Sequence, residues 1–570
     1  MRETSQIIHM GHMRKGARAL ALLLCLLLLA ACGGTPAGGG TPAGGGTPAA
    51  GGTEAGGTPA GGNEPAAAPA AAEDGPILVG LGFDVTTLDP GHSYEYYCSL
   101  IIPMIYDNLL KLAPGADGPQ PCLAESYAVA EDNVTYTFKL RQDAVFASGN
   151  KLTSKDVKFS FDRMKHLQTN SSIHLEGVES VETPDDYTVV IKLNAPDSSF
   201  TTKLTVQTFA VLDSVVVAAN GGLDTEAAVS DDTAEAYITA NPVGSGPFIV
   251  ESFTPSLEIT LRRNPNYWGA PAAAERVIVR NMSDANAALM MLQNGDLDVA
   301  LNMTPQQLPQ LAGSADITVE NVPTNTITYL LMNQDAEYAG PIANPDVRRA
   351  IAYAINYKNI HALAGEGAFT PYSMVQSSFV GYYGERPEDY TDLEKAKELL
   401  ARAGYPDGFD ITLEVGDYEA AGTKLTDLAQ LVVNDLAQIG VNATIAVLES
   451  NIAVQKYVEG KQGFALWLWT PDYNELNNQL AFMPEQKCGR YVNWTADMSP
   501  RIAELTGLVA SELDNAQRVI YARELQELVA DGGPWLDLCQ HPRIVAYRSN
   551  IGSVDSNDSY HLFLNTLSRG

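Results

Sequence analysis

The sequence predicts an α/β protein built from more than one domain. Its 570 residues far exceed the roughly 100 to 150 of a typical single domain. Hydrophobic residues make up 45% of the chain and charged residues only 18%, which excludes an intrinsically disordered protein. From Pro76 onward, apolar residues recur in short blocks with a period of either two or 3.6 residues. This is the pattern of strands that alternate with helices.

Residues 1–31 have the pattern of a lipoprotein signal peptide. Arg14, Lys15 and Arg18 precede an apolar run from Ala19 to Leu29, and two alanines separate this run from Cys32. A membrane-spanning helix needs about 20 apolar residues, so the run is too short to span a bilayer. We therefore expect cleavage before Cys32 and lipidation of that cysteine. A plain secretory signal is the alternative, and Cys25 is a poorer lipidation site because the bulky Leu24 precedes it.

Residues 32–75 are expected to form a flexible linker. Gly-Gly-Thr-Pro-Ala units repeat up to about Gly62, and an alanine-rich stretch continues to Gly75. Such a composition has too little apolar surface to offset the entropy of ordering. A lipid followed by this linker would tether a globular body to the outer face of a membrane, so we expect an extracytoplasmic, monomeric protein.

The composition also excludes several kinds of chemistry. The net charge of −32 argues against nucleic acid and anionic membrane surfaces as partners. The sequence has no GxSxG, HExxH or P-loop motif, and no metal-ligand spacing of cysteine or histidine, so we expect no enzyme, metal or cofactor. In an extracytoplasmic protein the remaining cysteines could form two disulfides, in any of three pairings. They are Cys98, Cys122, Cys488 and Cys539.

Individual strands and helices can be assigned along the body. Residues 135–140 alternate as in a half-buried strand, and Thr153 then caps a helix. Another alternating strand, 257–261, is expected to pair through a turn with residues 248–250. These elements predict sheets with helices packed on their faces.

The second half of the body continues this alternation. Residues 391–394, Thr-Asp-Leu-Glu, predict a capping box that opens a helix ending before Gly404. A longer amphipathic helix at 425–439 is expected to stop at Gly440, and residues 464–469 form an apolar strand.

A resemblance to a known family covers nearly all of residues 77 to about 554 and rests on a series of short blocks. The blocks are 87–90, 105–109, 122–127, 136–141, 146–149, 152–157, 242–248, 263–268, 293–298, 344–355 and 396–408. In number, order and spacing they resemble the extracytoplasmic solute-binding proteins of ABC importers. The particular family includes oligopeptide, dipeptide and nickel binders.

This resemblance implies a two-lobed fold like that of periplasmic binding proteins, with hinge strands and an extra subdomain inserted in the first lobe. The chain would cross between the lobes near Thr326 to Asn333 and near Leu538 to Ile544. Ligand would bind in the cleft, and closure about the hinges would bury it. Lobe I would comprise residues 76–112, 240–325 and 541–570, the inserted subdomain 113–239, and lobe II 326–540.

The segment from Trp467 to Glu475 is the most informative about the ligand. An apolar strand runs directly into a polar turn, and the turn resembles the Trp-x-x-Asp-Tyr-Asn-Glu stretch of oligopeptide binders. In that family the aspartate pairs with the α-ammonium group of a peptide, which assigns this role to Asp472. The alternative is that Asp472 caps the helix that follows.

The sequence departs from the peptide-binding pattern at two positions, so a ligand other than a peptide is also possible. Thr470 stands where peptide binders often carry a disulfide cysteine, and Leu476 replaces the usual proline. Trp467, Trp469 and Tyr473 could instead stack on sugar rings, as in the oligosaccharide binders of the same family.

Further ligand contacts are expected from both lobes. Tyr94, Glu95 and Tyr96 precede a helix at a position that borders the cleft in family members. Arg490 and Asn493 lie where family members contact ligand after the aspartate turn, and Arg490 could meet a carboxylate.

The sequence therefore predicts a membrane-tethered substrate-binding subunit of an ABC importer that captures peptides and delivers them to the permease. A binder of oligosaccharide or another solute, or a sensory co-receptor, is the alternative. A glycosidase that uses Asp472 and Glu475 is disfavoured, because two carboxylates near one helix start do not flank a scissile bond.

Overall fold

The computed structural model describes residues 75–116, 118–387, 389–556 and 562–570. The chain separates into two units, Met1–Ala71 and Ala72–Gly570, and all of the described residues belong to the second. The expected signal peptide, the lipidation site at Cys32 and nearly all of the expected linker lie outside the described residues.

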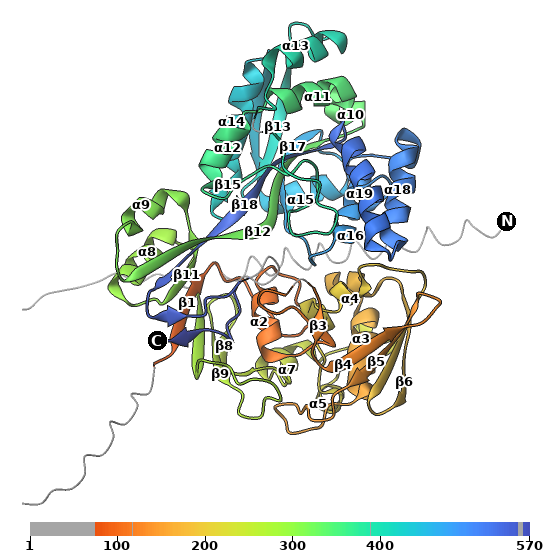
Figure 1. The fold of residues 1–570 in the computed structure, drawn as a ribbon, viewed down its shortest axis with the longest axis vertical. Helices are drawn as coiled ribbons and strands as arrows, with labels where there is room; N and C mark the ends of the chain where they lie inside the picture. Colours follow the sequence, from red (N-terminus) through yellow and green to blue (C-terminus); the bar gives the residue numbers. More distant parts are fainter. Residues whose placement is uncertain (1–74, 117, 388, 557–561) are drawn as a thin grey trace, which may run out of the picture. The chain divides into compact units, whose positions relative to one another are not determined.

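A ten-stranded mixed sheet with strand order β16-β13-β17-β12-β18-β11-β1-β10-β9-β8 runs through the described body (Figure 1). The predicted pairing of 257–261 with 248–250 is confirmed, because β9 lies antiparallel to β8. We call lobe I the part built on β1 (Ile77–Leu81), β8 (Phe248–Thr254), β9 (Glu258–Arg263), β10 (Arg276–Asn281) and β11 (Val299–Met303). Lobe II is the part built on β13 (Phe409–Gly416), β16 (Val441–Leu448) and β17 (Phe464–Trp469).

Two long strands join these lobes as an antiparallel pair, β12 (Ile317–Met332) and β18 (Trp535–Arg548). On the lobe I side β18 also pairs with β11, and on the lobe II side β12 also pairs with β17. Figure 1 shows both strands passing from one lobe to the other. The two-lobed fold with hinge strands is therefore present.

The change of lobe coincides with a break in this strand pair. Pro323 lies opposite Pro542, neither proline has an N–H to donate, and the register shifts before pairing resumes at Ile327. The first crossing therefore begins a few residues before the expected Thr326, whereas the second lies inside the expected 538–544. Side chains bridge the break: the Gln540 amide donates to the Thr324 carbonyl at 2.8 Å.

The helices of lobe II follow the sequence pattern closely. The predicted helix at 425–439 is α14 (Leu425–Ala437), and Gly440 follows with a φ of 82°. The other helices are α10 (Ala336–Ala339), α11 (Pro345–Ala354), α12 (Tyr357–Ala364), α13 (Leu393–Arg402), α15 (Ser450–Val458), α16 (Leu476–Gln479), α17 (Lys487–Arg490), α18 (Pro500–Ser511) and α19 (Asn515–Ala530). Shorter elements are η4 (Gly340–Ala343), η5 (Leu480–Phe482), η6 (Ala496–Met498), β14 (Glu419–Ala420) and β15 (Thr423–Lys424).

The cap of α13 differs from the prediction by one residue. The Asp392 carboxylate accepts the N–H of Lys395 at 3.0 Å, so Asp392 is the N-cap and not Thr391. The Thr391 hydroxyl instead donates to the carbonyl of Ile355 at 2.6 Å. Ile355 is the C-cap of α11, and the last carbonyls of a helix have no partner within that helix.

Residues 109–211 build a separate core on a four-stranded sheet with order β4-β5-β7-β6, which we call the small-sheet region. The predicted strand 135–140 is β5, and Thr153 forms a capping box with Asp156 at the start of α3. Its main elements are β4 (Ala124–Val129), β5 (Thr135–Leu140), β6 (Val178–Asp185), β7 (Thr188–Leu193), α3 (Ser154–Leu167), α4 (Phe200–Lys203), η1 (Asn170–Leu175) and η2 (Gln207–Phe209).

The remaining elements of the body are short. They are α2 (Cys98–Ile105), α5 (Ser214–Ala219), α6 (Ala228–Asp231), α7 (Glu235–Ala240), α8 (Ala285–Asn294), α9 (Leu308–Leu311), η3 (Pro305–Gln307), β2 (Leu110–Lys111), β3 (Gln120–Pro121), β19 (Ile551–Gly552) and β20 (Ser568–Arg569).

The four cysteines of the body are free and buried, so the two possible disulfides are absent from the described residues. Three of them belong to different hydrophobic clusters: Cys98 to that of lobe I, and Cys488 and Cys539 to two separate clusters of lobe II. Cys122 lies elsewhere, with its thiol 3.5 Å from Asp107. Cys98, Cys488 and Cys539 are thus packed among apolar side chains.

A buried group of charges ties lobe I to the small-sheet region. The Arg163 guanidinium on α3 lies 2.7 Å from the Asp89 carboxylate and 2.8 Å from that of Asp232, and all three side chains are at most 1% exposed. Burial alone would raise the pKa of Asp89, but hydrogen bonds from His92 and Arg163 hold it well below its usual value. The two buried carboxylates can therefore stay charged only because the Arg163 guanidinium lies beside them.

Arg163→Met should destabilise the protein by about 3 to 5 kcal/mol, because it leaves two buried carboxylates without their cation. Denaturant unfolding measures this loss. Arg501→Met, which removes exposed ion pairs to Glu504 and Glu524, is the control and should have a much smaller effect. An equal loss of stability in the two variants would contradict the role given to Arg163.

Candidate functional site

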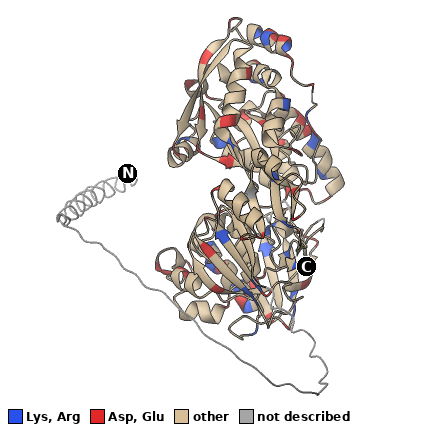
Figure 2. Ribbon diagram, turned by 90° about the vertical axis from the view of Figure 1, so that its left-hand side faces the viewer, with Lys and Arg blue, Asp and Glu red and all other residues tan. Residues whose placement is uncertain are grey.

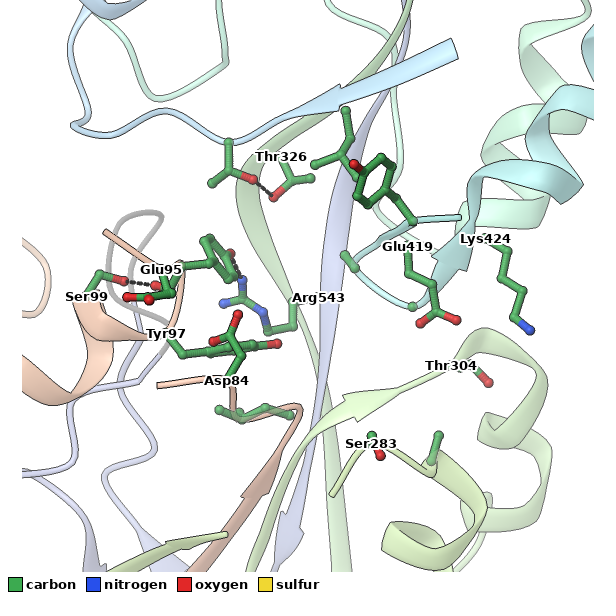
Figure 3. A pocket seen from close by; sticks show the side chains of 18 of the residues that line it. Asp84, Glu95, Tyr97, Ser99, Ser283, Thr304, Thr326, Glu419, Lys424 and Arg543 are labelled. Atoms are coloured by element: carbon green, nitrogen blue, oxygen red, sulfur yellow. Dashed lines mark hydrogen bonds between the residues drawn. The ribbon is translucent and has the colours of Figure 1, made fainter. Parts of the chain in front are cut away.

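A cavity of about 1150 Å³ lies where lobe I, lobe II and the hinge strands meet. Lobe I contributes the loop after β1, the segment before α2 and the start of α8. Lobe II contributes the β14–β15 hairpin and the turn after β17. Figure 3 shows side chains from these elements facing one space.

Asp472 lies in this cavity and makes a direct contact between the lobes. The Tyr94 hydroxyl of lobe I donates to Oδ1 of Asp472 at 3.1 Å. Burial, together with the charge of Asp472, raises the pKa of the Tyr94 hydroxyl, so this tyrosine stays a neutral donor.

Asp472 does not cap the helix that follows. The N-cap of α16 is Glu475, whose carboxylate accepts the N–H of Asn477 at 2.6 Å and forms a buried ion pair with Arg518. The capping alternative for Asp472 is therefore wrong. Glu475 is also committed to Arg518, which removes the second carboxylate that a glycosidase interpretation needs.

The turn that carries Asp472 is bound to the hinge. Thr470 and Thr326 share a hydrogen bond at 2.9 Å, drawn in Figure 3, and the Asn325 amide donates to Oδ1 of Asn474 at 2.7 Å. Asn325 and Thr326 lie in the irregular stretch of β12 between Pro323 and Ile327. The turn that carries Asp472 and the point where the chain crosses between lobes are thus held together.

Acidic side chains outnumber basic ones around the cavity. The lining residues include five carboxylates but only two cations, Lys424 and Arg543. Partial burial and the neighbouring charge of Glu95 raise the pKa of Asp84. The excess of carboxylates makes the electrostatic potential of the cavity negative, which favours a ligand that carries positive charge. The carboxylates are Asp84, Glu95, Asp284, Glu419 and Asp472.

The predicted lobe I residues Tyr94, Glu95 and Tyr96 all line the cavity. Glu95 already accepts from the Thr86 hydroxyl at 2.9 Å and from the Tyr94 N–H at 3.2 Å. The Tyr96 hydroxyl accepts from Arg543 at 2.6 Å. These hydrogen bonds hold the segment before α2 in place.

The two tryptophans of β17 have different surroundings. Trp469 lines the cavity, and its ring meets Phe482 edge to face at 5.2 Å. Trp467 is only 8% exposed and does not line the cavity; its Nε1–H donates to Gln462 at 2.7 Å. Of the two, Trp469 is the one placed to contact a ligand.

Three other predicted contacts lie away from the cavity. Tyr473 is buried in the core of the small-sheet region, beneath the Lys203 ammonium at 5.6 Å. The exposed Arg490 donates to the carbonyl of Glu485 at 2.6 Å, and the Asn493 amide donates to Asn333 at 3.0 Å. Arg490 and Asn493 thus stabilise local turns of lobe II in this structure.

Several cavity residues were not predicted. Figure 3 shows Glu419 and Lys424 extending from the β14–β15 hairpin toward the lobe I segments that carry Ser283 and Thr304. A Cβ added at Gly422, whose φ is 86°, would lie 3.1 Å from the Met303 carbonyl, so this hairpin closely approaches lobe I. In the sequence, this hairpin is visible only as a glycine-containing turn after a strand. Such a turn does not indicate a ligand contact.

Two other kinds of site, a membrane-spanning helix and a metal-binding group, have no candidate within the described part of the chain. No helix there is long and apolar enough to cross a membrane. No three acidic, cysteine or histidine side chains gather there as a metal ion would require. Figure 2 shows basic and acidic residues scattered over both lobes.

A two-lobed α/β fold with a polar cavity at the lobe junction is that of the periplasmic solute-binding proteins. The family model described as "Bacterial extracellular solute-binding proteins, family 5 Middle" matches residues 118–487. The chain therefore belongs to family 5 of the bacterial extracellular solute-binding proteins.

Individual relatives cover most of the chain. The glutathione-binding protein GsiB of Salmonella typhimurium is 28% identical over 516 residues, which cover 85% of this chain and 92% of that protein. The heme-binding protein A of Haemophilus influenzae is 25% identical, over 85% of this chain and 89% of that protein. The structure of the periplasmic binding protein DppA of Helicobacter pylori, in complex with the peptide STSA, has a TM-score of 0.71. It is 25% identical and covers 87% of this chain and 98% of that chain.

Proposed function

We propose that this protein captures short peptides in the interlobe cavity and delivers them to the permease of an ABC importer. The observation that carries the proposal is the position of Asp472, a carboxylate in a predominantly acidic cavity that both lobes contribute to. A charge-assisted hydrogen bond between a carboxylate and an ammonium contributes about 1.5 to 3 kcal/mol. The α-ammonium group of a peptide would replace the Tyr94 hydroxyl on Asp472.

The other end of the peptide requires a cation. Arg543 is hydrogen-bonded to Tyr96, whereas Lys424 is exposed and extends from the hairpin that faces lobe I. We assign the peptide carboxylate to Lys424. Ligand pockets for small molecules measure roughly 300 to 1000 Å³, so a cavity of about 1150 Å³ has room for a peptide of a few residues.

The ligands of two relatives support a peptide. One relative is named for glutathione, and the Helicobacter pylori structure contains the peptide STSA. Both relatives cover more than four fifths of this chain. The Helicobacter pylori protein is itself associated with an ABC transporter.

Binding would close the lobes because the ligand contacts both. A ligand shifts a conformational equilibrium only by its differential affinity for the two states. A peptide held by Asp472 and Lys424 of lobe II and by Glu95 and Asp84 of lobe I would favour the closed state. The permease would then recognise the closed protein.

Trp469 keeps an oligosaccharide as the second candidate, because an aromatic ring that lines a cavity can stack on a sugar. Five lining carboxylates favour a ligand with an ammonium group, such as a peptide, over a neutral sugar. A sensory co-receptor would use the same closure with a different membrane partner.

Asp472→Asn should lower the affinity for a peptide with a free amino terminus more than tenfold, measured by calorimetric titration with STSA. The variant keeps the shape of the side chain but leaves the ammonium without its charge partner, a loss of about 2 to 5 kcal/mol in a desolvated site. Asp497→Asn, at an exposed aspartate of the same lobe, is the control and should bind as the wild type does.

N-acetylated STSA should bind the wild type weakly and the Asp472→Asn variant no worse. Equal affinity of the wild type and Asp472→Asn for free-amino STSA would rule out the ammonium role. If no peptide binds and Trp469→Ala abolishes the binding of an oligosaccharide, the sugar alternative is correct.

We further propose that a lipid on Cys32 anchors the protein to the membrane, through a linker of residues 32–75. Mass spectrometry of protein extracted from the membrane should show a mature chain that begins at a diacylated Cys32. The Cys32→Ala variant should be found in the soluble fraction. A wild-type chain that starts elsewhere and carries no lipid would contradict the anchor.

A further inference from the structure

The small-sheet region contacts lobe II at a second place, beside the ligand cavity. Nδ2 of Asn477, at the start of α16, lies 3.3 Å from Oδ1 of Asp197, 3.1 Å from Oγ of Ser198 and 3.1 Å from the carbonyl of Ala510. The N–H and hydroxyl of Ser198 both donate to that same carbonyl, at 3.3 and 3.1 Å. None of these four residues lines the cavity.

Tyr473 strengthens this contact with apolar surface. It comes from lobe II but is only 8% exposed and packs in the core of the small-sheet region, with the Lys203 ammonium over its ring. Lys203 also lies 2.7 Å from the Asp197 carboxylate, and Ser199 donates to the same carboxylate at 2.6 Å. The small-sheet side of the contact is therefore a preformed surface.

A buried arginine connects this contact to the ligand turn. Arg518 on α19 is only 2% exposed, forms an ion pair with Glu475 and donates to Oδ1 of Asn477 at 2.7 Å. Glu475 caps α16 and Asn477 lies in its first turn, three and five residues after Asp472. A shift of this turn would therefore move Asn477 and Asp472 together.

We propose that the contact of residues 197–203 with Tyr473, Asn477 and Ala510 is a latch that favours the closed state and sets ligand affinity from outside the cavity. The inference rests on the proposed closure of the two lobes. Because the latch contains no cavity residue, it biases the open–closed equilibrium equally in the presence and absence of ligand. Apparent affinity falls in proportion to the fraction of the binding-competent state.

Asn477→Asp tests the latch with little change in shape. It retains the oxygen that accepts from Arg518 but turns a second oxygen toward the Asp197 carboxylate and the Ala510 carbonyl. If the latch is real, it holds part of the ligand-free wild type in the closed state, and saturating ligand closes the rest. The radius of gyration of the ligand-free variant, measured by small-angle X-ray scattering, should therefore exceed that of the ligand-free wild type. Its affinity for the probe peptide STSA should fall about tenfold.

Asn442→Asp is the matched control. The Asn442 amide donates to Asp410 at 3.0 Å, so the variant creates the same pair of facing carboxylates at an exposed site wholly within lobe II. Its radius of gyration should equal that of the wild type. Adding Asp197→Asn to Asn477→Asp restores an amide–carboxylate pair across the contact and should return the radius to the wild-type value.

An unchanged radius in Asn477→Asp would overturn the latch, and so would an expanded radius that Asp197→Asn fails to reverse. Failure of STSA to bind the wild type would contradict the peptide proposal alone, because the scattering comparison uses ligand-free protein.

Discussion

The break in the hinge strands is the constraint on which the rest of the structure depends. Two prolines face each other where the β12–β18 pair passes between lobes, so the ladder of backbone hydrogen bonds cannot continue there. Side chains of the same stretch hold the turn of Asp472, through Asn325 to Asn474 and Thr326 to Thr470. The point where the backbone can bend is therefore bonded directly to the point where ligand is expected to bind.

The parts on either side of this break are built to move as units. Buried Arg163 joins the small-sheet region to lobe I, so a hinge motion carries both together toward lobe II. On the other side, buried Arg518 joins α19 to the turn of Asp472. Closure then brings two rigid surfaces together at the cavity and, beside it, at Asn477. The proposed latch would give the small-sheet region a role in binding although it contributes little to the cavity lining.

The sequence predicted those features that depend on local patterns. The alternation of apolar and polar residues predicted β5 and β9, and the amphipathic spacing of apolar residues predicted α14. The change from apolar strand to polar turn after Trp469 predicted that Asp472 lies in the cavity. Features that depend on tertiary contact were missed. Trp467 and Tyr473 are packed in cores, Lys424 and Glu419 reach the cavity only because a hairpin approaches lobe I, and the cysteines are buried in separate places. Residue type and spacing do not encode which of two cores, or which lobe, a side chain will face.

Native mass spectrometry of the protein purified from the cells that produce it tests the central claim most directly. The account predicts that a peptide of a few residues copurifies with the wild-type protein and dissociates when the two lobes are unfolded. It also predicts that Asp472→Asn is recovered largely without peptide. A neutral sugar, or any solute retained equally by the wild type and by Asp472→Asn, would contradict a cavity organised around the ammonium group of a peptide.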